Sequence, residues 1–183
     1  GFTLACLMAQ SEKIERSIYP FVLVSQTFPK EALAPLLLIW LGYGIWPKVA
    51  VAALISFFPI AISTLRGLTT VEPVLVDVMR TLAASKWDVF WKLRLPNSLP
   101  HLMSGLKMGA TLSVIGAVVG EFVGSDAGLG HLIQVGNSQL STDLTFAALF
   151  ALGAMSLGLF LAVEAIERQL LSRYDRVTYF DLR

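Results

Sequence analysis

The residues best suited to a specific interaction lie between Asp77 and Pro100, in the run DVMRTLAASKWDVFWKLRLPNSLP. The run combines carboxylates, amines, guanidinium groups and tryptophan, and long apolar stretches lie on both sides of it. Such a charged and aromatic surface suits binding to another molecule. Apolar side chains recur at helical spacing and predict a first short helix that carries the stripe Leu75, Val78, Met79 and Leu82.

Sequence signals mark the ends of two short helices. The run 69–72, TTVE, is a candidate capping box for the first helix, with Pro73 tolerated in its first turn. The run 85–88, SKWD, offers a second N-cap with an acid at its third helical position. Pro96 is expected to end the second helix, whose apolar face consists of Phe90, Trp91 and Leu95 beside Lys86, Lys92 and Arg94.

Two amphipathic helices of this kind fit two roles. They can lie on a lipid surface, where Trp and Lys are common. They can also insert into a groove of a soluble partner protein. The residues alone leave both interpretations open.

The composition indicates a membrane protein. Of 183 residues, 55% are hydrophobic and 15% are charged, whereas a soluble domain is typically about 25% charged. The net charge of +1 gives no indication of a nucleic-acid partner. Cys6 is the only cysteine and there are two histidines, so the composition favours neither a disulfide nor a metal site.

Apolar runs predict several membrane-spanning helices. Residues 49–65, 99–119 and 144–163 are three clear spans, the first with Pro59 inside it. Residues 18–46 have two interpretations: one broken helix, or a short interfacial helix followed by a span over about 32–46. The apolar run that starts at Gly1 is too short to span and is expected to be the end of a truncated helix.

Lysine and arginine are concentrated in alternate connecting segments. Segments 10–17 and 66–97 are basic, whereas segment 120–143 has no Lys or Arg. Because basic residues favour the cytoplasmic side, we expect segment 66–97 and the C-terminus to be cytoplasmic. The C-terminal basic residues are Arg168, Arg173, Arg176 and Arg183.

The spacing inside segment 66–97 resembles the EAA loop of ATP-binding-cassette (ABC) importer permeases. That signature reads Glu-Ala-Ala, three residues, Gly, nine residues, Ile, one residue and Leu-Pro. Here 77–79 (DVM) takes the first place, Ala83 the place of the Gly, and 93–96 (LRLP) the last.

The runs FPKEALAPLLLIWLGYG, FFPIAISTLRGL, AASKWDVFWKLRLP and GEFVGSDAGLGHLI are similar to permeases of the nitrate, sulfonate and taurine branch. The last run is also similar to permeases for thiamine-precursor pyrimidines.

The loop departs from the signature at four positions. Asp77 keeps the negative charge, whereas Val78 and Met79 are bulkier than the two alanines. Ala83 replaces the residue that best tolerates a left-handed turn, which leaves the angle between the two helices open.

The resemblance implies an all-α, polytopic transmembrane bundle with the MetI-like permease fold, in one domain over residues 1–183. It implies a bacterial inner-membrane homodimer with a cytoplasmic ABC ATPase and a periplasmic or lipid-anchored solute-binding protein. The ATPase uses the ATP, and this chain is not an enzyme and binds no cofactor or metal. The coupling loop covers about 67–97, and the residues carried over are Asp77, Arg80, Ala83, Ala84, Ser85, Trp87, Leu93 and Pro96.

A solute pathway needs polar groups at membrane depth. The candidates are Gln26, Thr27, Lys30, Ser56, Ser113 and Glu121. The alternatives are that Lys30 and Glu31 snorkel near an interface, and that the hydroxyls bond their own helices. Lys107 is expected to snorkel or to form a salt bridge. Small residues predicted to make helix contacts are Gly109, Gly116, Gly120, Ala154 and Gly158.

No nucleophile–base pair or nucleotide-binding loop is evident, since the Gly-rich run 120–130 lacks the Lys-Ser/Thr of a P-loop. That run is either a re-entrant turn at the pathway exit or a structural turn.

A channel or ion-coupled carrier is the alternative function; it needs an embedded acid or base, for which Lys30 with Glu31, or Glu121, are the candidates. A non-transporting anchor is a third class. A small sulfonate, a nitrate-like anion or a pyrimidine all fit as the solute.

Overall fold

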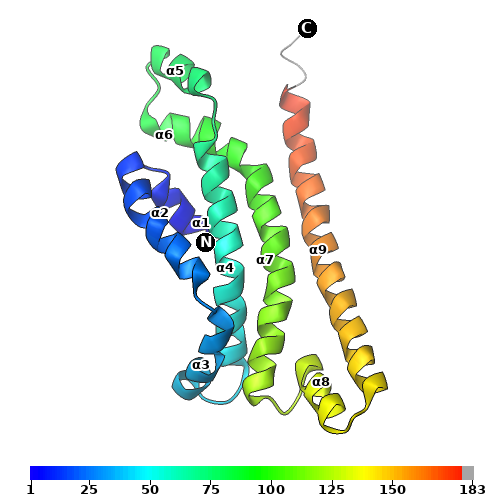
Figure 1. Cartoon of the computed structure of the whole chain (residues 1–183). Helices are drawn as coiled ribbons and strands as arrows, with labels where there is room; N and C mark the ends of the chain where they lie inside the picture. The colour runs from blue at the N-terminus through cyan, green and yellow to red at the C-terminus, as the bar shows by residue number, and fades with distance from the viewer. Residues whose placement is uncertain (179–183) are drawn as a thin grey trace.

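Helices form every regular element that the structure, a computed structural model, describes; it describes the backbone of residues 1–178 and the side chains of residues 1–172 (Figure 1). The all-α fold class is therefore confirmed. In chain order the elements are α1 Phe2–Met8, α2 Glu12–Thr27, a 3₁₀ turn Lys30–Leu33, α3 Ala34–Leu41, α4 Ile45–Thr69, α5 Pro73–Thr81, α6 Lys86–Val89, a π-helical turn Phe90–Arg94, α7 Leu95–Gly124, α8 Leu129–Ser138 and α9 Thr142–Thr178.

Three helices of the described residues are long and apolar enough to cross a membrane. They are Ile45–Thr69, Lys86–Gly124 and Thr142–Ser172, and they contain the spans predicted at 49–65, 99–119 and 144–163. The 25 residues of α4 extend about 37 Å at 1.5 Å per residue, which exceeds the hydrocarbon thickness of about 30 Å. Pro59 lies inside α4, and the helix continues through it.

The segment from α2 to α3 is a broken helix. Glu12–Thr27 and Lys30–Leu41 meet at 78°, because Pro29 has no N–H to donate and the residue before it, Phe28, is extended. This bend fits the broken-helix interpretation, and the pair forms either one broken span or a re-entrant segment. The alternative span over about 32–46 is wrong, since α3 has eight residues, about 12 Å, and the chain turns at Gly42 and Gly44, both at positive φ.

Glycines let α4 and α7 pack almost backbone to backbone. A Cβ on Gly116 would lie 2.6 Å from Cα of Ala52, and one on Gly67 would lie 2.7 Å from Cα of Ser98. Neither contact leaves room for a methyl group. Gly109 and Gly120 also lie against α4, as predicted, but Gly158 on α9 has no neighbouring atom within 4 Å of an added Cβ.

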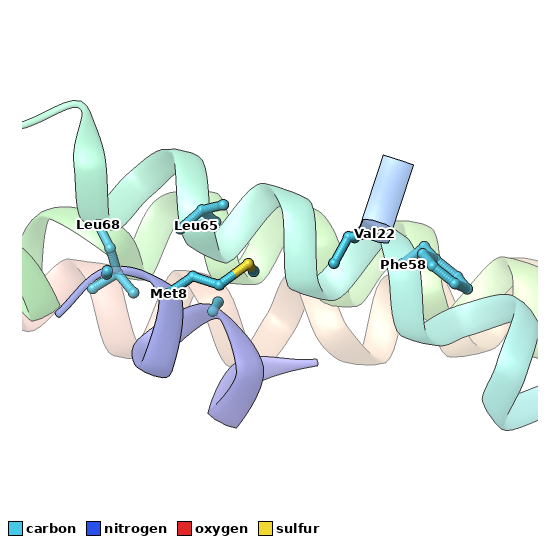
Figure 2. Close-up of a cluster of buried hydrophobic side chains, with 7 residues drawn as sticks. Met8, Val22, Phe58, Leu65 and Leu68 are labelled. Atoms are coloured by element: carbon cyan, nitrogen blue, oxygen red, sulfur yellow. The ribbon is translucent and has the colours of Figure 1, made fainter. Parts of the chain in front are cut away.

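The N-terminal helices cover one face of α4. Figure 2 shows Met8 of α1 beside Leu65 and Leu68 of α4, with Val22 of α2 next to Phe58 farther along the same helix. Met8 and Leu68 are fully buried. This cluster fixes the α1–α2 turn near the end of α4.

The chain turns at two opposite ends of the bundle (Figure 1). The start of α2, the α5–α6 segment and the last turns of α9 lie at one end, here called the α5 end; α3 and α8 lie at the other, the α8 end. This arrangement matches the predicted alternation of basic and non-basic segments. The tail residues Arg173, Arg176 and Arg183 lie outside the described side chains.

Replacing Gly116 with Ala should destabilise the protein by about 1–3 kcal/mol, because the added methyl group overlaps the α4 backbone. The midpoint of thermal unfolding in mild detergent measures this loss. Gly153→Ala is the matched control, since nothing lies within 4 Å of its added Cβ, and it should lose no stability. Equal stability of the two variants would contradict the close α4–α7 packing.

Candidate functional site

The predicted coupling residues lie together in the α5–α6 segment and its junction with α7. Asp77 and Arg80 are on α5 and form an exposed ion pair of 3.1 Å. Trp87 lies on α6 and is 66% exposed. The remaining residues of this set are Ala83 and Ala84 in the turn, Ser85 at the start of α6, Leu93 in the π-helical turn and Pro96 at the start of α7.

The predicted capping box at 69–72 is wrong. Thr69 is the last residue of α4, and its hydroxyl donates to the carbonyl oxygen of Leu65 inside that helix, at 2.9 Å. Because α4 extends through Thr69, this hydroxyl is not available to α5. α5 instead begins with Glu72 as N-cap, without a side-chain bond, and Pro73 in the first turn.

Ala83 adopts the left-handed conformation that the signature reserves for glycine. Its φ is 55°. The Ala84 N–H donates to the carbonyl of Met79 and the Ala83 N–H to that of Arg80, both at 3.0 Å. These two bonds define a Schellman motif with Ala83 at its left-handed position. The turn between the two helices therefore forms with an alanine at its left-handed position.

The second helix starts at the N-cap predicted at Ser85, and Asp88 completes a capping box there. The Ser85 hydroxyl accepts from the backbone N–H of Asp88 at 3.1 Å, and the Asp88 carboxylate accepts from the backbone N–H of Ser85 at 3.2 Å. Hydrogen bonds from Lys92 and Ser85 lower the pKa of Asp88 to about 2. Because this folded-state pKa is depressed, the ionised cap is fully formed above the ordinary aspartate pKa, about 3.9, and weakens as the pH falls toward about 2.

Pro96 does not end the second helix, contrary to the prediction. The chain continues from α6 through the π-helical turn into α7, so Lys86–Gly124 is one continuous helix. The N–H of Leu95 donates to the carbonyl of Phe90, five residues earlier, and the wider turn lets Pro96 occupy a first-turn position of α7. The short α6 is therefore joined to a candidate span without a loop.

The α5 stripe is largely exposed. Leu75 is 46% exposed, Val78 50% and Leu82 72%, and Met79 is half-buried. Trp87 and Phe90 lie edge to face at 6.2 Å between ring centroids, and Phe90 also packs against the cluster that contains Met8 and Leu68. An apolar stripe beside exposed charge is the composition of a docking surface.

Two anchors of this segment were missed by the sequence analysis. Arg94 donates from Nη1 to the carbonyl oxygen of Ala9, at 2.8 Å, and so binds the C-terminal end of α1. Asn97 donates from Nδ2 to the carbonyl oxygen of Gly67 on α4, at 2.9 Å. These contacts cross 85 and 30 residues of sequence, so no local pattern could have indicated them.

The six candidate pathway residues do not form one site. Gln26, Thr27 and Lys30 meet at the break between α2 and α3, where Lys30 Nζ donates to the carbonyl oxygen of Gln26 at 2.9 Å. The Lys30 ammonium also lies 4.3 Å from the ring centroid of Phe58, near the middle of α4 rather than at an interface. Ser56 and Ser113 lie elsewhere and bond their own helices, at 2.7 Å from the carbonyl oxygens of Ala52 and Ala110.

Glu121 joins α7 to α8. Its Oε2 accepts from the backbone N–H of Gly130 at 2.6 Å, in the first turn of α8, where a carboxylate is favourable. Nearby, Lys48 Nζ donates to Ser125 Oγ at 2.5 Å, across 77 residues. Gly128, at φ 124°, leaves no room for a side chain beside Glu121. Within the Gly-rich run 120–130, residues 125–128 form the turn between α7 and α8.

Lys107 forms a salt bridge, one of its two predicted fates. Its Nζ lies 2.6 Å from Glu167 Oε2 on α9, and both side chains are largely buried. The sequence analysis missed Glu167, because it lies beyond the apolar run 144–163. Among the described residues, no group of His, Cys, Asp and Glu is placed to hold a metal ion.

Residues 1–176 match the family described as the binding-protein-dependent transport system inner membrane component. The chain belongs to this family. Its members named below are transport permeases, so the family is one of transporters and not of enzymes.

Several curated permeases are similar to this family member. The formylaminopyrimidine transport permease of Halalkalibacterium halodurans is 39% identical, over 93% of this chain and 68% of the relative. The riboflavin transport system permease of Chloroflexus aurantiacus is 36% identical, over 88% and 60%. The taurine transport system permease of Escherichia coli is 29% identical, over 93% and 62%. The chain thus spans about two thirds of the length of these permeases.

Replacing Ala83 of this permease-family chain with Gly should raise the free energy of unfolding by about 1 kcal/mol, because the left-handed conformation is strained for a residue with Cβ. Ala83→Val should lower it. Thermal unfolding in mild detergent measures both. Ala84→Gly is the control, since Ala84 has no positive φ and gains nothing from glycine. A gain for Ala84→Gly equal to that for Ala83→Gly would contradict the assigned turn.

Ser85→Ala should weaken the start of α6 by about 1 kcal/mol, the usual contribution of an N-cap side chain. Amide hydrogen exchange should be faster for residues 86–89 than in the unchanged protein. Ser138→Ala serves for comparison, because the Ser138 hydroxyl bonds a carbonyl within its own helix. Unchanged exchange over 86–89 would be evidence against the capping box.

Proposed function

We propose that this chain is the transmembrane permease subunit of an ABC importer, which moves a small polar solute by alternating access. The observation that carries the proposal is the α5–α6 segment: an exposed helical hairpin with EAA spacing, continuous with a candidate span in a chain of the permease family. A hairpin built in this way can convert a push on its surface into movement of a helix in the membrane.

The partner at the α5 end is a cytoplasmic ABC ATPase. The apolar stripe of α5 and the exposed Trp87 fit a groove, and ATP is bound and used by that subunit rather than by this chain. This assignment makes the α5 end and the C-terminus cytoplasmic, in agreement with the basic segments. A solute-binding protein, periplasmic or lipid-anchored, docks at the α8 end, and two permease chains pair in the inner membrane.

The solute is a small polar molecule. The names of similar permeases include formylaminopyrimidine, riboflavin and taurine, which supports a pyrimidine or a sulfonate- or nitrate-like anion. The break at Gln26, Thr27 and Lys30 offers backbone carbonyls and an ammonium near the middle of α4. Broken helices of this kind commonly form transport sites.

An ion-coupled carrier is disfavoured by the family assignment. The acid–base pair that such a carrier needs is absent at Lys30 and Glu31, which form no salt bridge with each other. Glu121 bonds a backbone N–H. The buried pair Lys107–Glu167 is a salt bridge between two helices, so the case against a carrier rests on the family assignment.

Asp77→Lys in the full-length protein should reduce ATP-dependent solute uptake about tenfold, because it reverses a charge on the surface that contacts the ATPase. Uptake into proteoliposomes, with the co-purifying ATPase quantified by mass spectrometry, measures the effect. Glu12→Lys is the matched control: Glu12 forms an exposed ion pair with Arg16 on α2, outside the hairpin. Uptake by the unchanged permease alone, without ATP or an ATPase, would refute the proposed function.

A further inference from the structure

The ion pair between Lys107 and Glu167 is the most costly polar contact among the described residues. Its two side chains are 20% and 15% exposed, whereas each of the other ion pairs there has at least one side chain 70% or more exposed. The pair joins two elements, α7 and α9, that are 60 residues apart in sequence. The Lys107 ammonium also faces the ring of Phe160 on α9, at 5.7 Å from its centroid.

The contacts of α7 with α4 give the depth of the pair. Two residues before Lys107, Gly105 lies against Pro59 and Ser63; two residues after it, Gly109 lies against Ser56 and Ile60. These α4 residues are in the middle of a helix that spans Ile45–Thr69. The backbone at Lys107 is therefore level with the middle of α4, whereas Glu167 lies beyond the apolar run 144–163 but still inside the candidate span Thr142–Ser172. Ionised side chains inside a span are expensive and tend to be functional.

The ion pair is the polar contact that joins α9 to α7 toward the α5 end. Only 6% of the apolar window of Thr142–Ser172 is fully buried by the described residues, and the buried position, Ala148, lies toward the α8 end. A half-buried stripe that includes Phe160, Val163 and Leu171 continues along the helix, and Figure 1 shows α9 at the side of the bundle, joined through α8 to α7. Toward the α5 end, and among the described side chains of α9, Glu167 alone makes a polar bond to another element.

An ionic contact can fix the position of one helix against another in lipid, which apolar packing does only weakly. Two apolar helix faces in lipid can slide and rotate past each other at little cost, since the lipid is as apolar as they are. A hydrogen-bonded charge pair fixes both axial position and rotation, because separating the charges would leave each of them unpaired at membrane depth. The pair thus sets the register between α7 and α9.

We propose that the Lys107–Glu167 ion pair transmits movement of the α5–α6 hairpin to α9 during transport. The hairpin continues into α7 without a break, so a push at the α5 end reaches Lys107 through one helix. The ion pair then makes α9 follow α7. This inference rests on the proposed importer function, and it makes Lys107 and Glu167 positioning residues rather than solute ligands.

The decisive variant is the double substitution Lys107→Met with Glu167→Met, in the full-length permease reconstituted with its ATPase. Replacing a buried ion pair with apolar residues of similar size often preserves stability. We therefore expect a folded complex that still hydrolyses ATP but moves at least fivefold less solute per ATP. We also expect the KM for solute to be unchanged, which would show that the solute site is intact.

Two further variants complete the test. The charge swap Lys107→Glu with Glu167→Lys should recover at least half of the transport per ATP, whereas either single reversal should not. Glu164→Gln is the matched control, since Glu164 lies one turn away and pairs with Arg168 on its own helix; it should transport normally.

Normal transport per ATP by the Met–Met variant would overturn the inference, because a merely structural pair would be replaceable in this way. A raised KM at normal turnover would also overturn it and would place the pair in the solute site. A different failure, in which the unchanged protein neither binds an ATPase nor responds to ATP, would refute the proposed function itself.

Discussion

The close contact between α4 and α7 is the constraint on which the remaining structure depends. It brings two backbones together at Gly67, Gly105, Gly116 and Gly120, where van der Waals packing replaces the hydrophobic effect that is absent between helices in lipid. The contact also positions polar groups. Asn97 reaches Gly67 because the helices touch there, and Lys107 is held level with the middle of α4.

The turn at Ala83 shows that a left-handed turn can form without the residue that best tolerates it. The two bonds of the Schellman motif satisfy the end of α5, and the capping box at Ser85 satisfies the start of α6. The strained residue Ala83 lies between these two helix ends. A similar arrangement ends α8, where Leu140 has φ 53° and the Ser141 N–H donates to the carbonyl of Gly136. In both turns, backbone bonds that satisfy the helix end outweigh the strain of a side chain in the left-handed region.

Local signals in the sequence predicted the local features. The apolar runs predicted the three long helices, and Ser85 with Asp88 predicted the N-cap of the second short helix. The predictions of helix ends were wrong where a distant or competing contact determines the local conformation. The local sequence around Thr69 favours a helix cap, and nothing local shows that α4 extends so far. Pro96 usually marks a helix end, and no simple sequence pattern indicates the π-helical turn that precedes it here.

The pairs that cross long distances in sequence could not be derived from spacing. Arg94 with Ala9, Lys48 with Ser125, and Lys107 with Glu167 each join separate elements. Residue type alone indicated only which side chains need a partner, as an embedded Lys does. The identity of each partner follows only from how the helices pack.

The continuity of α6 with α7 gives the permease a mechanical form. Because no flexible loop separates the two helices, a force applied at α6 reaches α7 directly. The close contacts at Gly67, Gly105, Gly116 and Gly120 hold α7 against α4 along its length, so the two helices would turn together as one rigid body. That rotation would reach the far end of α7, where Glu121 binds the start of α8.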